Sequence, residues 1–237
     1  MFNLKEFYVL GLPIDTDIGK INFIKVKDYP DHIIDLQNIG MSKQEIIYQY
    51  SEMNEDGKLD ELIDELESLS LYGISIGLEN FRQSYFNVLH KMFGDEEALH
   101  KINEESFNIY RKLILDMNCI NEEKINPNPE IQKAIERSRR VKSMDQDKLT
   151  FSDICSSIVA YSGNDYNDLL NWTVYQLYMT FHRIGLFKNY DTSTLFATVS
   201  EKATVENWSK HIDLFEEENH VMEESKFKNT TGEMFTE

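Results

Sequence analysis

The sequence predicts a mainly α-helical protein with a small N-terminal β-hairpin, or two paired strands, and a disordered acidic C-terminal tail. Three observations support this fold class. After Asp28, apolar residues recur at steps of three and four, which is the spacing of one helix face. The first thirty residues are instead rich in β-branched and aromatic residues. The last 22 residues hold seven acidic groups against two lysines and have little periodicity.

The strand signals come from two short stretches near the N-terminus. Residues 7–10 (FYVL) and 20–27 (KINFIKVK) have the composition of strands. The residues between them, GLPIDTDIG, supply turn-forming residues at Gly11, Pro13 and Gly19. We therefore expect the two stretches to pair with each other.

Helix signals follow in order up to residue 122. Pro30 fits a first helical turn and Gly40 a stop, and Ser42 with Glu45 has the spacing of a capping box. Three later segments each carry one apolar stripe, and the first of these is expected to end at Gly73. The stripes are Leu59, Leu62, Ile63, Leu66 and Leu69; Phe81, Tyr85, Val88, Leu89 and Met92; and Phe107, Tyr110, Leu113, Ile114 and Met117.

The composition changes after residue 122. Residues 123–150 contain two of the four prolines and few large apolar groups, and residues 133–142 hold five basic side chains against a single acidic one, Glu136. Such a segment has little to bury, which predicts an exposed linker or a solvated helix. We expect an N-terminal domain at 1–122, a basic linker or helix at 123–149, a C-terminal helical domain at 150–215 and an acidic tail at 216–237.

The C-terminal domain contains an aromatic-rich segment, NWTVYQLYMTFHRIG at 171–185. Thr150 and Asp153 open the preceding helix at capping-box spacing. Asn171 is expected to cap the aromatic helix and Gly185 to stop it, with further helices at 191–200 and 204–215. One side of the aromatic helix has core spacing: Val174, Leu177, Tyr178, Phe181 and Ile184. Three rings lie away from the centre of this stripe and need cover from a neighbouring helix or a partner: Trp172, Tyr175 and His182.

Charge and hydropathy narrow the class of protein. A net charge of −18 disfavours binding to nucleic acids or anionic membranes, because both would repel the chain. No window approaches the 18 consecutive apolar residues of a membrane span, and the N-terminus lacks a secretory signal. Two cysteines, Cys119 and Cys155, suggest a reducing compartment. These features predict a cytosolic protein.

The sequence lacks the usual motifs of catalytic, cofactor and metal sites. Residues 52–63 approach a calcium loop, but the twelfth position is Ile63, where calcium needs a bidentate glutamate. The six histidines show neither HExxH nor zinc spacing, and the phosphate-binding glycine motifs and GxSxG are missing. We therefore expect no enzyme activity, no cofactor and no metal.

One block in the C-terminal domain carries a family resemblance. LLNWTVYQLYMTFHRI follows a basic segment and an LTFSDI segment, and a Trp-Ser-Lys-His-Ile segment at 208–212 comes after it. Residues 137–215 together resemble the C-terminal part of tail assembly chaperones from long-tailed phages and prophages of Gram-positive bacteria. Trp172 departs from the smaller residue expected at its position. The N-terminal half resembles the family only through its short strands and acidic helices.

The resemblance implies a non-enzymatic role in the cytoplasm of the infected bacterial host. Similar proteins bind the tape measure protein, keep its apolar helices from aggregating and help the tail tube assemble, so the tail tube protein is a further expected partner. The candidate partner-binding residues are Trp172, Tyr175, Tyr178, Phe181 and Trp208. The alternatives are a structural tail or other virion-associated protein, and an enzyme or host-factor inhibitor without a readable motif. The sequence leaves the oligomeric state open, a homo-oligomer included.

Overall fold

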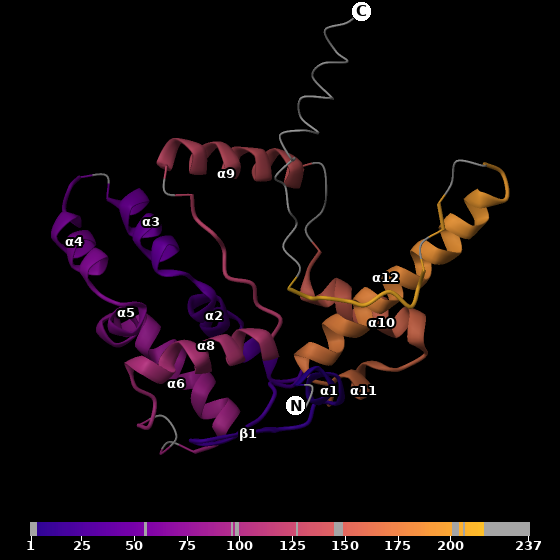
Figure 1. The fold of residues 1–237 in the computed structure, drawn as a ribbon, viewed down its shortest axis with the longest axis horizontal. Coiled ribbons are helices and arrows are strands. Elements are labelled where there is room, and N and C mark those ends of the chain that lie inside the picture. Colours follow the sequence, from indigo (N-terminus) through magenta and orange to yellow (C-terminus); the bar gives the residue numbers. More distant parts are fainter. Residues whose placement is uncertain are drawn as a thin grey trace, which may run out of the picture.

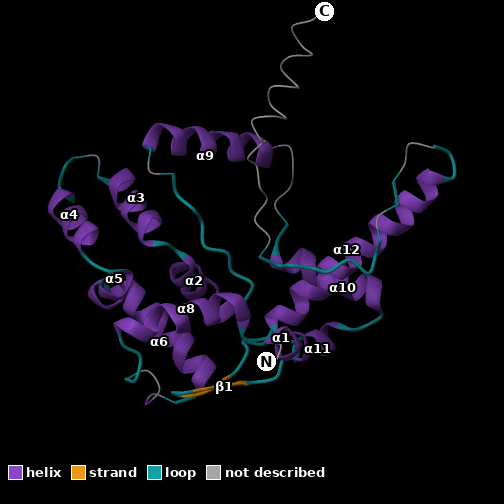
Figure 2. Ribbon diagram, viewed as in Figure 1, coloured by secondary structure: helices purple, strands orange, loops and turns teal. Residues whose placement is uncertain are grey.

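The structure, a computed structural model, describes residues 4–54, 56–95, 97, 100–126, 128–144, 149–200, 204–205 and 207–215. Within these residues the chain is mainly helical and carries one two-stranded antiparallel sheet, which confirms the predicted fold class (Figures 1 and 2). The predicted disordered tail at 216–237 lies outside the described residues.

The N-terminal hairpin is present, but its strands are not where the sequence placed them. Strand β1 (Ile14–Thr16) pairs with β2 (Gly19–Ile21), and Ile14 lies opposite Ile21. The FYVL stretch instead belongs to helix α1 (Leu4–Leu10). A short apolar run such as FYVL is compatible with either a strand or a helix, so its composition alone does not distinguish the two. Here α1 buries Tyr8 and packs on the long C-terminal helix. This tertiary packing favours the helical conformation of FYVL over a strand.

The described residues that follow form these helices of the N-terminal half: α2 (Tyr29–Gly40), α3 (Lys43–Met53), α4 (Asp60–Ser68), α5 (Leu71–Gly77), α6 (Glu79–Phe93) and α8 (Glu104–Met117). The predicted cap at Ser42 is confirmed, since its side chain accepts a bond from the Glu45 amide at 3.1 Å. The helix expected to run as far as Gly73 is in fact two helices. The Ser70 side chain accepts from the Gly73 amide and so starts α5.

The C-terminal half contains α9 (Pro129–Met144), α10 (Phe151–Ser162), α11 (Tyr166–Leu169) and α12 (Val174–Ala197). The capping box of Thr150 and Asp153 is confirmed. Helix α12 starts after Thr173 rather than Asn171, and it runs through Gly185 and into the separate helix expected at 191–200. Glycine inside a helix costs only about 1 kcal/mol relative to alanine, so it need not end one. The helix predicted at 204–215 is wrong for the described residues 204–205 and 207–215.

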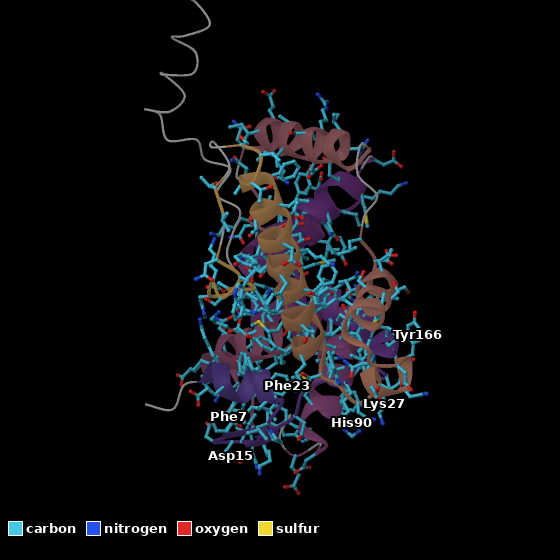
Figure 3. All side chains as sticks on the ribbon, turned by 90° about the vertical axis from the view of Figure 1, so that its right-hand side faces the viewer. Phe7, Asp15, Phe23, Lys27, His90 and Tyr166 are labelled. Atoms are coloured by element: carbon cyan, nitrogen blue, oxygen red, sulfur yellow. The ribbon has the colours of Figure 1, made fainter. Side chains whose placement is uncertain are left out.

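One core joins the two halves of the chain. Aromatic residues from the N-terminal segment, Tyr8 and Phe23, pack with Val174 and Tyr175 at the start of α12. Figure 3 shows Phe23 near the lower end of that helix. Two smaller clusters of described residues lie beside this main core. They are Val26, Ile154, Ile158, Leu169 and Leu177 under α10 and α12, and Ile46, Leu66, Ile74 and Phe81 among α3 to α6.

A buried arginine fixes the end of α2. From α8, the Arg111 guanidinium donates to the carbonyl oxygens of Ile39 at 3.0 Å and Met41 at 2.9 Å. It also pairs with the carboxylate of Glu122. The last carbonyls of a helix lack partners within the helix, so Arg111 satisfies groups that burial would otherwise leave unpaired.

Replacing this arginine should destabilise the fold. Arg111→Met would leave buried carbonyl oxygens without donors, and we expect the free energy of unfolding to fall by about 3 kcal/mol. Urea denaturation followed by circular dichroism measures this loss. Arg82→Met, which removes an exposed pair with Glu79 on α6, is the control and should cost less than about 1 kcal/mol. Equal losses in the two variants would contradict the role assigned to Arg111.

Candidate partner-binding face

The start of α12 is tied to the N-terminal segment by backbone hydrogen bonds. The Val174 amide donates to the Ile24 carbonyl at 3.0 Å, and the Val26 amide donates to the Trp172 carbonyl at 2.9 Å. Thr173 caps the helix, and its side chain accepts from the Gln176 amide at 3.1 Å. These bonds set the direction in which α12 leaves the core.

Tyr175, a predicted partner-binding residue, lies in the core rather than on the surface. It is 4% exposed and packs edge-on against Tyr8, with ring centroids 5.2 Å apart, and against Phe23 at 6.4 Å. Burial raises the pKa of Tyr175 to about 12, with a smaller contribution from Cys119. The ring is therefore covered by α1 and by Phe23, and it offers almost no surface to a partner.

The next three predicted rings are half-buried. Trp172 and Phe181 pack on the small cluster under α10, and Tyr178 contacts both this cluster and the main core. Burial also raises the pKa of the Tyr178 hydroxyl, with the neighbouring Tyr29 adding to the shift. These rings therefore serve the packing of α12, and only their outer edges face solvent.

The last predicted ring, Trp208, lies in a turn at the start of a non-helical segment that runs beside α12. We call residues 207–215 the strap. The Arg183 guanidinium on α12 donates to the carbonyls of Trp208 at 2.7 Å and Lys210 at 3.0 Å. The Trp208 ring stacks on Phe187 with centroids 5.1 Å apart, yet Trp208 remains 44% exposed. Of the five predicted rings, Trp208 is the most accessible.

The strap also encloses a hollow of about 450 Å³ between α1, α8 and α12. Its apolar wall includes Tyr8, Tyr175 and Met179. The Lys5 ammonium lies 3.0 Å from Nε2 of His211 at its rim. Asp116 lines the same hollow, and burial raises the pKa of its carboxyl group. The hollow is thus mostly apolar, with charged groups of both signs around it.

The second half of α12 leaves the core. Among the described residues, no α12 side chain beyond Ile184 belongs to any of the hydrophobic clusters. Figure 1 shows this end of the helix projecting from the body, with the strap returning toward α10. Large apolar side chains are exposed there: Leu195 at 69%, Phe196 at 59% and Val199 at 81%. We call Phe187, Leu195, Phe196, Val199 and Trp208 the distal face.

Sequence reasoning missed most of the distal face. Because Gly185 was expected to end the helix, residues 194–199 were placed in a separate helix with no assigned side. Two features of the sequence indicated that the helix continues past Gly185. No proline follows this glycine, and the apolar residues Leu186 and Phe187 come directly after it. Of the five predicted partner-binding rings, only Trp208 belongs to the distal face, and its role in binding stays a prediction.

The described residues offer little for catalysis or metal binding. They contain no group of three or more His, Cys, Asp or Glu side chains placed to hold one metal ion. Burial raises the pKa of both thiols, Cys119 and Cys155, which keeps them protonated and weakly nucleophilic. At the rejected calcium loop, the Asn54 amide donates to the Asp60 carboxylate at 2.6 Å instead.

Two substitutions test whether Tyr175 is a core residue and Trp208 a surface residue, by the stability that each one costs. Tyr175→Ala should lower the free energy of unfolding by about 3 kcal/mol, because it leaves a cavity among packed aromatics. Trp208→Ala removes one exposed stacking contact and should cost less than about 1.5 kcal/mol. Urea denaturation measures both values. A loss for Trp208→Ala as large as that for Tyr175→Ala would mean that the Trp208 ring belongs to the core and not to the surface.

Comparison with known proteins identifies the family. Residues 2–127 match the YomV N-terminal domain, and residues 142–213 match the YomV second domain. The SPbeta prophage-derived uncharacterized protein YomV of Bacillus subtilis (strain 168) is 41% identical over 230 residues, which cover 97% of each chain. No solved structure matches this chain. None of the helices within the described residues has the length and apolar character needed to cross a bilayer. The chain belongs to the YomV family, which includes this prophage-derived protein.

Proposed function

We propose that this chain is a non-enzymatic phage tail assembly chaperone that binds apolar helices of the tape measure protein. The distal face carries the proposal, because large apolar side chains are exposed at the projecting end of α12. The resemblance of residues 137–215 to tail assembly chaperones supports it, as does the prophage origin of the YomV relative. A client with exposed apolar helix faces requires such a surface on a well-solvated body.

The charge of the chain fits this role. A net charge of −18 keeps the chaperone and its complexes soluble through mutual repulsion. It also favours clients with basic stretches over nucleic acids. The apolar distal face can then bind a client while the rest of the molecule prevents further association.

The size of the distal face favours reversible binding. Full burial of a Leu, Val or Phe side chain contributes about 1.5–3 kcal/mol. Association itself costs at least about 4 kcal/mol in lost translational and rotational freedom. A few side chains therefore give modest affinity, which suits a chaperone that must release its client to the growing tail.

Co-expression tests the proposal. The full chain is produced with the tape measure protein encoded by the same phage or prophage element, and the soluble fraction is subjected to a pull-down. We expect the tape measure protein to be soluble and to co-purify only when this chain is present. A tape measure protein that stays insoluble, or is soluble without binding this chain, contradicts the proposal.

Paired variants then locate the surface. Leu195→Ser with Phe196→Ser should reduce the recovered tape measure protein several-fold without lowering the thermal unfolding temperature. Ile34→Ser with Ile109→Ser is the matched control, since both isoleucines are 69% exposed but lie on α2 and α8. If the control pair weakens binding equally, general surface hydrophobicity rather than the distal face binds the client.

A further inference from the structure

A groove rich in positive charge crosses α8 on this strongly acidic chain. It has a volume of about 610 Å³ and is lined by four basic side chains, Lys43, Arg111, Lys112 and Lys124, against two acidic ones, Asp116 and Glu122. Its apolar wall includes Leu71 and Ile120. The basic residues come from three separate segments that the fold brings together.

Two of these cations are already paired within the groove. Arg111 pairs with Glu122, and the Lys112 ammonium lies 3.3 Å from the Asp116 carboxylate. Lys43 differs, since it donates to the carbonyl oxygens of Glu67 at 2.8 Å and Leu69 at 2.6 Å. Within the described part of the chain it forms no ion pair with a carboxylate. Counted over the whole lining, basic side chains outnumber acidic ones by four to two, and an anionic segment would balance this excess.

The chain itself leads an acidic segment to this groove. Phe215, the last described residue, lines the groove, and Leu214 and Phe215 both pack on the main core. The Asp213 carboxylate accepts from the Phe215 amide at 3.0 Å, which fixes the turn before that point. Three glutamates follow at once, and residues 216–224 read EEENHVMEE.

We infer that residues 216–224 occupy this groove in the same molecule. Their carboxylates face Lys43, Lys112 and Lys124, and Val221 with Met222 covers the apolar wall. Nine residues reach at most about 30 Å when extended, and the direct chain connection gives a high effective concentration. The neighbouring hollow beside α3 is a poorer site, because four glutamates line it against one lysine, Lys124.

Cross-linking tests the inference, independently of client binding. The full chain is prepared as an equal mixture of unlabelled and heavy-isotope-labelled protein and treated with a zero-length carbodiimide, which joins carboxylates to lysine amines. Mass spectrometry should find Glu223 and Glu224 linked to Lys43 and Lys124 within one isotopic form. These links should exceed those to Lys20 and Lys58, which lie outside the groove, by several-fold. Glu216–Glu218 are not used, because chain connectivity alone holds them nearby.

Charge variants sharpen the test. Lys112→Gln with Lys124→Gln should reduce the links from Glu223 and Glu224 to Lys43 several-fold. Lys20→Gln with Lys58→Gln makes the same change in net charge, removes two exposed ion pairs and should leave those links unchanged. Thermal unfolding confirms that each variant is folded.

Three outcomes would overturn the inference. Links that join one isotopic form to the other would place the tail on a second copy. Links concentrated on Lys133 of α9, or spread evenly over the exposed lysines, would place it elsewhere. Links to Lys43 that survive Lys112→Gln with Lys124→Gln would show that the charge of the groove does not hold the tail.

Discussion

The arrangement of this protein depends on the backbone bonds between residues 24–26 and residues 172–174. Ile24 is buried in the main core and Val26 in the cluster under α10, so this short segment belongs to both. Its hydrogen bonds to Trp172 and Val174 hold the start of α12 between the two clusters. Because the first half of α12 is fixed in this way, the second half projects from the body and keeps its apolar side chains exposed. The exposed apolar surface that we propose for client binding thus results from how the core is closed.

Local signals in the sequence predicted the helical class and several helix starts. The caps at Ser42 and Thr150 depend on a side chain three residues from its partner, so they could be recognised without tertiary information. The strands could not be placed in this way, since FYVL is equally compatible with a helix until Tyr8 meets Tyr175. The length of α12 was missed because a glycine was given more weight than the helix-forming residues around it.

The candidate sites were harder to predict than the fold. Spacing on a helical wheel separates the faces of a helix but does not tell which face another element covers. Tyr175 is covered by α1, whereas Trp208 is held in the strap by Arg183 and stays accessible. The groove rich in positive charge that crosses α8 has no sequence signature. Lys43, Arg111 and Lys124 are far apart in the sequence and line one groove only after α3, α8 and the segment that follows α8 have packed together.

The composition of purified phage particles most directly tests the central claim that this chain acts during tail assembly. Particles are induced from the element that encodes the chain, and quantitative mass spectrometry compares its copy number with that of the tail tube protein, in particles and in the lysate. A chaperone that releases its client should be abundant in the lysate and scarce or missing in particles. A fixed, stoichiometric amount in particles would contradict the account and identify the chain as a structural virion component.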